Sequence, residues 1–109
     1  MLLLLDENLP KRLKFDFPEH EIYTVRDKHW NGIKNGALLK LLLKNSFNAL
    51  LTYDKNLQHQ QNFLKYTITV FVLTAKINQY AELTKLTPKI KKYLNSGQMP
   101  AGPVIISNE

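Results

Sequence analysis

Short, continuous apolar runs are the feature of this sequence that most limits how the chain can fold. The clearest are LLLL at residues 2–5 and TITVFVL at residues 67–73, and ALLT at residues 49–52 is a third. Runs of this length without polar alternation are typical of strands buried on both faces of a parallel sheet. The β-branched and aromatic residues 21–26 predict another strand, and residues 104–106 predict a last one.

Amphipathic segments separate these runs and predict helices. We expect helices at residues 9–17, 36–44, 56–62 and 79–94. Pro10 is placed for a first helical turn, Asn35 suits an N-cap, and Pro88 interrupts the last segment. The alternation of strands and helices predicts an α/β fold, a three-layer α/β/α sandwich with a mostly parallel sheet. A length of 109 residues suits a single domain over residues 1–109.

Composition limits the chemistry further. The chain has no cysteine, which excludes a disulfide framework, a thiolate metal site and a cysteine nucleophile. No apolar run approaches the roughly 20 residues needed to cross a bilayer, and the first residues lack the pattern of a signal peptide. We therefore expect a cytoplasmic protein without a membrane partner. Fifteen basic and 9 acidic residues give a formal charge of +6, which suits either a polyanionic partner or a solvated lysine surface.

Three aspartates stand just past predicted strands. Asp6 follows residues 2–5, Asp27 follows residues 21–26, and Asp54 follows the third strand. Because parallel strands end on one edge of the sheet, these carboxylates are expected to converge in space. Carboxylates in one crevice repel each other unless a cation neutralises them, and a hard cation such as Mg²⁺ or Mn²⁺ fits oxygen ligands. The alternative is that each aspartate starts a turn or caps a helix.

Two classes of active site place acids after the first and third strands. One is a metal-dependent nuclease. The other is a phospho-accepting receiver domain, in which an acidic pair binds Mg²⁺ and a third aspartate accepts a phosphoryl group. Thr74 would suit the switch hydroxyl of a receiver, but residues 104–109 contain no lysine, which a receiver needs after its last strand.

Four segments together resemble the small stand-alone PIN-like proteins of bacteria, relatives of a superfamily of metal-dependent ribonucleases that includes VapC-type toxins. The resemblance extends to about Pro88 and is less definite in the tail. Its most specific parts are the starting LLLLDENLP and the T-x-D-x-N-L-x-x-Q-Q-N segment taken together. The segments are residues 2–10, 20–27, 30–39 and 50–62.

The resemblance implies a PIN-like sandwich and a set of site residues. Asp6 matches the metal-binding aspartate of the first strand, and Asn8 matches the polar residue two positions later. Thr52, Asp54 and Asn56 match a T-x-D-x-[DN] segment in which Asp54 is an acid of the metal site. Those five residues, together with Asn35, make up the implied catalytic set.

The chain departs from the usual PIN pattern at two acids. Asn35 stands where PIN nucleases place an acid at the start of a helix, and Asn56 stands where they often carry another. Amides keep oxygen ligands but remove charge. Asp6 and Asp54, with Asp27 and Glu7 as helpers, could hold one Mg²⁺ with several waters, and would support a two-metal mechanism poorly.

The implied substrate is RNA. Lys11, Arg12 and Lys55 could neutralise phosphates that flank the cut bond, and Gln61 could read an RNA edge or sugar. A cognate antitoxin protein is a partner implied by the resemblance alone. Five leucines within residues 38–43 exceed what one helix stripe needs, so a homodimer or partner-helix interface is a further expectation.

Three functions follow, in order of preference. The first is a Mg²⁺-dependent ribonuclease of the PIN-like type, with the toxin half of a toxin–antitoxin pair as its implied setting. The second is a module with the same fold and a weakened site that binds RNA or a partner protein without cutting. The third is a receiver-type phospho-acceptor.

Overall fold

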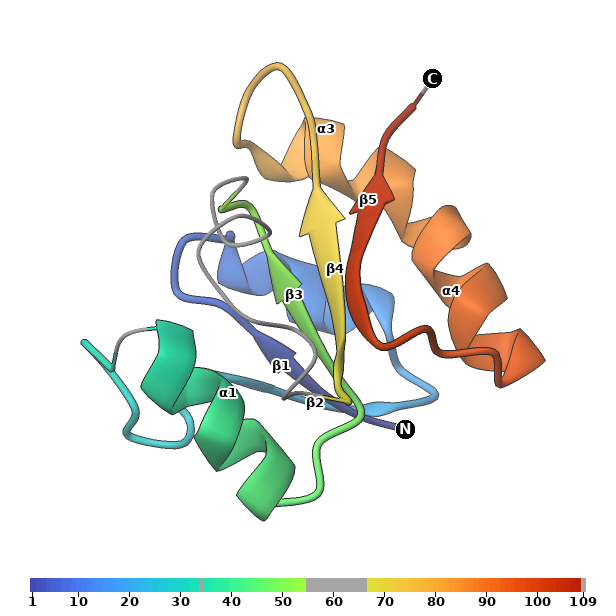
Figure 1. Cartoon of the computed structure of the whole chain (residues 1–109). Helices are drawn as coiled ribbons and strands as arrows, with labels where there is room; N and C mark the ends of the chain where they lie inside the picture. The colour runs from blue at the N-terminus through green and yellow to red at the C-terminus, as the bar shows by residue number, and fades with distance from the viewer. Residues whose placement is uncertain (34, 55–66, 109) are drawn as a thin grey trace.

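A five-stranded, all-parallel sheet forms the centre of the protein. A computed structural model describes residues 1–33, 35–54 and 67–108. The strand order is β2-β1-β3-β4-β5, and every neighbouring pair is parallel (Figure 1). This confirms the predicted α/β fold. The strands are β1 (Leu2–Leu5), β2 (Glu21–Thr24), β3 (Ala49–Thr52), β4 (Thr69–Leu73) and β5 (Gly102–Ile106).

The three central strands are apolar except for Thr52 in β3 and Thr69 in β4, because both faces of these strands are covered. In β1, Leu3 and Leu5 belong to one core cluster, while Leu4 belongs to the cluster on the opposite face. The same alternation places Leu51 with the first cluster and Leu50 with the second. All five of these leucines are at most 1% exposed, which explains the uninterrupted runs in the sequence.

Helices cover the two faces and complete the three layers (Figure 1). The second cluster packs under α1 (Asn35–Lys44). The first cluster packs under four elements: the 3-10 helix η1 (Lys11–Asp16), α3 (Tyr80–Leu83), the 3-10 helix η2 (Thr84–Leu86) and α4 (Thr87–Ser96). Among the described residues, none of these helices has the length and hydrophobicity that a bilayer crossing requires.

Several predicted elements have different bounds. The helix expected over residues 9–17 is the shorter 3-10 helix η1, and the helix expected over residues 79–94 is divided into α3, η2 and α4. Pro88 lies in the first turn of α4, where a missing N–H costs no hydrogen bond. Asn35, expected as the N-cap, is itself the first residue of α1. The helix predicted at residues 56–62 lies outside the described residues.

The leucine-rich segment of α1 is used mainly within the molecule. Leu38, Leu39 and Leu42 are at most 2% exposed and pack against the sheet. Leu41 and Leu43 are half-buried. The excess of leucines is therefore largely accounted for by the core, and a homodimer through this face stays a prediction.

The connections of the sheet create a switch between β1 and β3. The chain leaves β1 through η1 on one face to reach β2, and then crosses through α1 on the other face to reach β3 (Figure 1). From the carboxyl ends of the neighbouring strands β1 and β3, the next strands along the chain, β2 and β4, lie on opposite sides in the sheet. In open parallel sheets, the crevice at such a switch is where ligands bind.

Candidate functional site

Asp6 and Asp54 lie at the switch between β1 and β3. Asp6 directly follows β1, and Asp54 comes two residues after β3. The Asp6 backbone N–H donates to Leu51 O at 2.9 Å, which extends the pairing of the two strands by one step. The two aspartates, far apart in the sequence, thus follow neighbouring strands at one edge of the sheet.

The Asp6 carboxylate is buried and held by two hydrogen bonds. Asp6 is only 8% exposed. The Thr52 hydroxyl donates to Asp6 Oδ2 at 2.7 Å, and the Glu7 backbone N–H donates to Asp6 Oδ1 at 2.8 Å. Each carboxylate oxygen can still accept further contacts, because an ionised carboxylate offers about four lone-pair positions.

Thr52 and Asn8 join the loop after β1 to the loop after β3. Thr52 Oγ1 accepts hydrogen bonds from the Asp54 backbone N–H at 3.1 Å and from Asn8 Nδ2 at 3.4 Å. Asn8 Oδ1 accepts from the Tyr53 backbone N–H at 3.2 Å. These contacts bring together four of the predicted catalytic residues and fix the backbone on which both aspartates stand.

Electrostatics of the site favour a positive partner for Asp6. Burial raises the pKa of Asp6 above its ordinary value, although the hydrogen bonds from Thr52 and Glu7 oppose the rise. The negative charges of Glu7 and Asp54 raise the pKa further. Asp54 is therefore close enough to act on Asp6 through space. A cation between the two carboxylates would remove this repulsion.

A small cavity opens beside Asp6. Its volume is about 220 Å³, and it lies between the carboxyl ends of β1 and β2. Asp6 and Glu7 line it on one side, and Lys11 and Arg26 contribute cationic side chains. The cavity thus combines a buried carboxylate with two cations that could contact a phosphate group. Lys11 is one of the residues predicted from the sequence to contact phosphate.

Two of the predicted residues are placed elsewhere. Asp27 accepts a hydrogen bond from the Thr24 backbone N–H at 2.8 Å and forms an ion pair with Lys14 at 2.8 Å. This turn ends β2 at Thr24, two residues earlier than predicted. The guanidinium of Arg12 lies 4.2 Å from the ring centroid of Tyr80, away from the lining of the cavity.

The described residues include no group of three or more His, Asp or Glu side chains that could hold a metal ion. The structure therefore does not assemble Asp27 with Asp6 and Asp54 into a three-carboxylate centre. Asn35 begins α1, and its side chain is not described. Lys55, Asn56 and Gln61, which were predicted from the sequence as site residues, lie outside the described residues.

Two residues of the site were missed by the sequence reasoning. Arg26 lines the cavity, and the only signal was its position directly after a predicted strand, beside the selected Asp27. Asn78 donates from Nδ2 to the Asn8 backbone carbonyl at 2.6 Å. Because Asn78 is 70 positions away in the chain, no local pattern could have indicated this contact.

Comparison with known proteins does not assign the chain to a family. No family model matches it, and no match was found among curated proteins or solved structures. The function must therefore be argued from the residues of the site.

Proposed function

We propose that this protein is a Mg²⁺-dependent ribonuclease of the PIN-like type, whose site is built on Asp6 and Asp54. The observation that carries the proposal is the pairing of the segment after β1 with the segment after β3, through the hydrogen bond from Thr52 to Asp6. These are the two segments with the most specific resemblance to PIN-like proteins. They also meet at the edge of the sheet where parallel α/β folds bind ligands.

The donor set suits Mg²⁺ or Mn²⁺. Mg²⁺ is commonly bound by one or two carboxylates together with waters and substrate phosphates, so a site without a third carboxylate is compatible with it. Asp6 and Asp54 would hold the ion, and Asn8 and Thr52 would keep their loops in place. When bound, the ion would supply Lewis-acid polarisation of a phosphodiester.

The cations of the cavity support a nucleic-acid substrate. Lys11 and Arg26 line the same cavity as Asp6, and phosphate groups are the common ligands of such side chains. An RNA strand that enters here would place a phosphate beside Asp6, which lines the cavity. A cognate antitoxin as protein partner is proposed from the resemblance alone.

The test is a cleavage assay on RNA with and without the metal. We expect cleavage that needs Mg²⁺ or Mn²⁺, stops on addition of a chelator, and is lost in Asp6→Asn and Asp54→Asn. The control is Glu82→Gln, because Glu82 is an acid on α3 that pairs with Lys85. Metal-dependent cleavage that persists in both aspartate variants would refute the proposal.

One observation favours the second candidate, a module that binds RNA or a partner protein without cutting. Both carboxylate oxygens of Asp6 already accept hydrogen bonds from the protein, as expected for a carboxylate that has become structural. RNA binding that survives both aspartate substitutions, without any cleavage by the natural sequence, would support this module over the ribonuclease.

The receiver-type phospho-acceptor ranks third. The strand order 2-1-3-4-5 is also found in receiver domains. Thr74, the proposed switch residue, donates its hydroxyl to Ile106 O at 2.9 Å. Labelling of Asp54 by acetyl phosphate would move this candidate to first place.

A further inference from the structure

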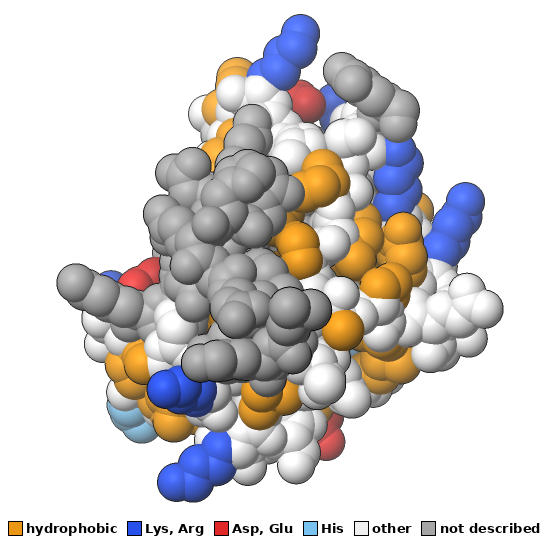
Figure 2. All heavy atoms as spheres, in the orientation of Figure 1, with side chains coloured by type: hydrophobic (Ala, Val, Ile, Leu, Met, Phe, Trp, Pro, Cys, Tyr) orange, Lys and Arg blue, Asp and Glu red, His pale blue; other side chains and the backbone are white. Residues whose placement is uncertain are grey.

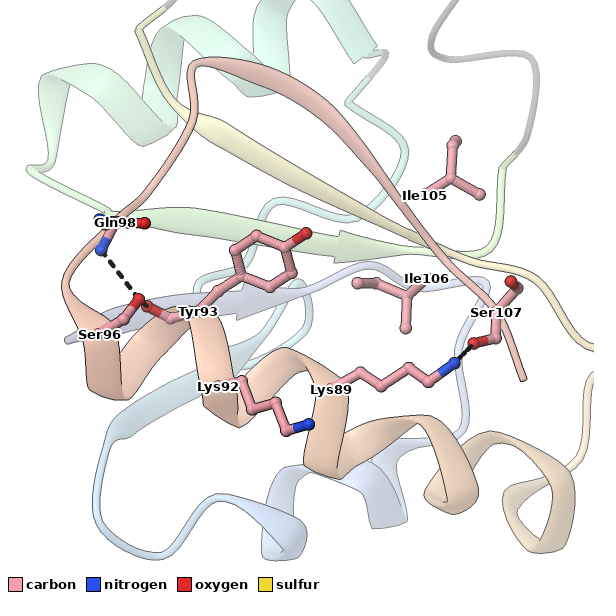
Figure 3. A pocket seen from close by; sticks show the side chains of 8 residues that line it. All are labelled: Lys89, Lys92, Tyr93, Ser96, Gln98, Ile105, Ile106 and Ser107. Atoms are coloured by element: carbon pink, nitrogen blue, oxygen red, sulfur yellow. Dashed lines mark hydrogen bonds between the residues drawn. The ribbon is translucent and has the colours of Figure 1, made fainter. Parts of the chain in front are cut away.

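A second cavity lies between α4 and the edge strand β5, outside the carboxylate site. Its volume is about 550 Å³. Figure 3 shows Lys89 and Lys92 projecting from α4, with Lys89 reaching the end of β5 at Ser107. The lining consists of Lys89, Lys92, Tyr93, Ser96, Gln98, Ile105, Ile106 and Ser107.

The charged side chains described in the lining are all cationic. It contains two ammonium groups together with hydroxyl and amide groups, and no carboxylate among the described residues. Lysine, serine, tyrosine and glutamine are side chains that donate hydrogen bonds to phosphate oxygens in nucleic-acid complexes. The cavity therefore suits an anion with several acceptor oxygens.

The two lysines in the cavity differ from their neighbours on the same helical segment. Lys85 pairs with Glu82 at 3.2 Å, and Lys91 pairs with Glu19 at 3.3 Å. Lys89 donates to a neutral acceptor, the Ser107 backbone carbonyl, and no carboxylate of the described residues pairs with Lys92. Within the described structure, positive charge is thus neutralised around the cavity but not inside it.

Two features of the outer edge of β5 disfavour the pairing of an added peptide strand. Gly102 N–H donates to Ile68 O, and Ile106 O accepts from Thr74 N–H, so these residues direct their backbone groups toward β4. The alternate residues, Pro103, Ile105 and Ser107, direct theirs outward. Pro103 has no N–H to offer, and the ammonium of Lys89 already occupies the Ser107 carbonyl. A peptide that pairs along this edge would lose contacts at both ends.

We propose that the cavity between α4 and β5 binds the sugar–phosphate backbone of single-stranded RNA. The proposal rests on the ribonuclease function proposed above and adds a second contact for the same substrate. Lys89 and Lys92 take adjacent phosphates, and the half-exposed Ile105 gives an apolar surface for a sugar or base. In the space-filling view, cationic side chains project from the outline of the molecule at several points, and apolar side chains are exposed over the β4–β5 region (Figure 2).

The position of the cavity fits one continuous strand of RNA. Ser107 directly follows β5, so it lies at the same edge of the parallel sheet as Asp6 and Asp54. An RNA segment that leaves the carboxylate pair across the end of β4 reaches Lys89 first and then Lys92. The cavity would hold the RNA and leave the chemistry to the other site.

The test measures binding of a short, unstructured, fluorescein-labelled oligoribonucleotide in the presence of a chelator, so that cleavage does not interfere. The test variant is the double substitution Lys89→Ala and Lys92→Ala. Its control is the double substitution Lys40→Ala and Lys44→Ala, which removes the same charge from exposed positions of α1 on the opposite face. Circular dichroism checks that both variants are folded, and Lys89→Gln with Lys92→Gln replaces the alanine pair if α4 loses helix.

We expect the variant in the cavity to bind RNA more weakly, by roughly 25-fold near 0.1 M salt, and the control to change little. The figure follows from the loss of about 0.7 released counterions for each of two phosphate contacts. The slope of log K against log salt concentration should fall by about 1.4 for the same reason.

Equal weakening in both double variants would overturn the proposal, because it would show only a non-specific effect of net charge. Absence of RNA binding by the natural sequence would overturn it as well. Binding of polyglutamate, but not RNA, that depends on Lys89 and Lys92 would show instead that the cavity takes an acidic protein segment. RNA binding that depends on both lysines, with no cleavage when the metal is present, would uphold the cavity and refute the ribonuclease. Metal-dependent cleavage together with RNA binding that does not depend on the lysines would uphold the ribonuclease and refute the cavity.

Discussion

The Thr52 hydroxyl donates a hydrogen bond of 2.7 Å to the buried Asp6 carboxylate, across the pair formed by β1 and β3. The same hydroxyl oxygen accepts from the Asp54 backbone N–H. A single side chain therefore sets the position of one aspartate and the backbone of the other. This makes Thr52 the residue on which the spacing of the two carboxylates depends.

Thr52→Val should loosen this arrangement without changing the size of the side chain much. We expect a loss of roughly 1–3 kcal/mol in the free energy of unfolding, because a buried carboxylate loses its donor. Chemical denaturation measures this loss. Thr52→Ser, which keeps the hydroxyl, should lose much less, and equal losses in the two variants would show that the methyl packing matters more than the hydrogen bond.

Asp6→Asn should abolish cleavage and yet stabilise the fold near neutral pH, because it removes a buried negative charge. The pKa of Asp6 is raised by burial, so the folded protein keeps this proton at pH values where the unfolded chain has lost it. The stability of the natural protein therefore falls as pH rises from about 3.8 to the raised pKa.

The advantage of Asp6→Asn should accordingly grow over that pH range and be small below it. Thermal unfolding of both proteins over a pH series measures the difference. A difference that stays constant with pH would mean that Asp6 does not titrate in this range.

The pKa of Asp16 is shifted in the opposite direction to that of Asp6. Asp16 accepts hydrogen bonds from the hydroxyls of Tyr80, Thr84 and Thr87, at 2.6, 2.6 and 2.9 Å, and so fastens η1 to the helices of the last crossover. Burial raises its pKa, but these hydrogen bonds outweigh burial, and the pKa of Asp16 is lowered overall.

Asp16→Ala should cost about 2 kcal/mol of unfolding free energy at neutral pH, since hydrogen bonds to a charged group are lost. The contribution of Asp16 is present above its unfolded pKa near 3.8 and is lost as pH falls through the lower folded value. The cost measured by denaturation should therefore shrink in acid. A cost that is the same in acid would indicate that packing of the side chain, not its charge, is responsible.

Lys11→Ala should raise the KM for RNA by about fivefold, the effect of one phosphate contact near 0.1 M salt, with a smaller change in kcat. Arg12→Ala should have a weaker effect, because Arg12 stacks on Tyr80 and does not line the cavity. Steady-state cleavage kinetics separate the two parameters. The reverse order of effects would place the path of the RNA on the other side of η1.

The sequence was sufficient to locate all five strands, because each contains a local apolar run. The structure begins β4 at Thr69, two residues later than predicted, and β5 at Gly102, two residues earlier than predicted. The predicted residues 2–5 and 49–52 agree with β1 and β3 in the structure. The prediction for β2 was two residues too long at its end, because Asp27 binds the Thr24 backbone and turns the chain there. That turn depends on a side-chain contact which apolar patterning does not report.

Only those residues of the site that come just after strands could be placed from the sequence. Asp6 and Asp54 could be placed at one edge of the sheet because parallel strands end together. The contacts of Asn78 with Asn8, and of Lys89 with Ser107, join segments brought together by the helices and strands around them. Such contacts depend on how helices settle on the sheet, which a single sequence does not encode locally.

The outer edge of β5 also limits how copies of this protein can associate. Growth of a filament by continuing the sheet from one copy to the next would require β5 of one molecule to pair with β2 of another. Pro103 offers no N–H to such a partner, and Lys89 already donates to the Ser107 carbonyl, so this contact is disfavoured. A symmetric pairing of β2 with β2 avoids both residues, and such a contact ends at two molecules.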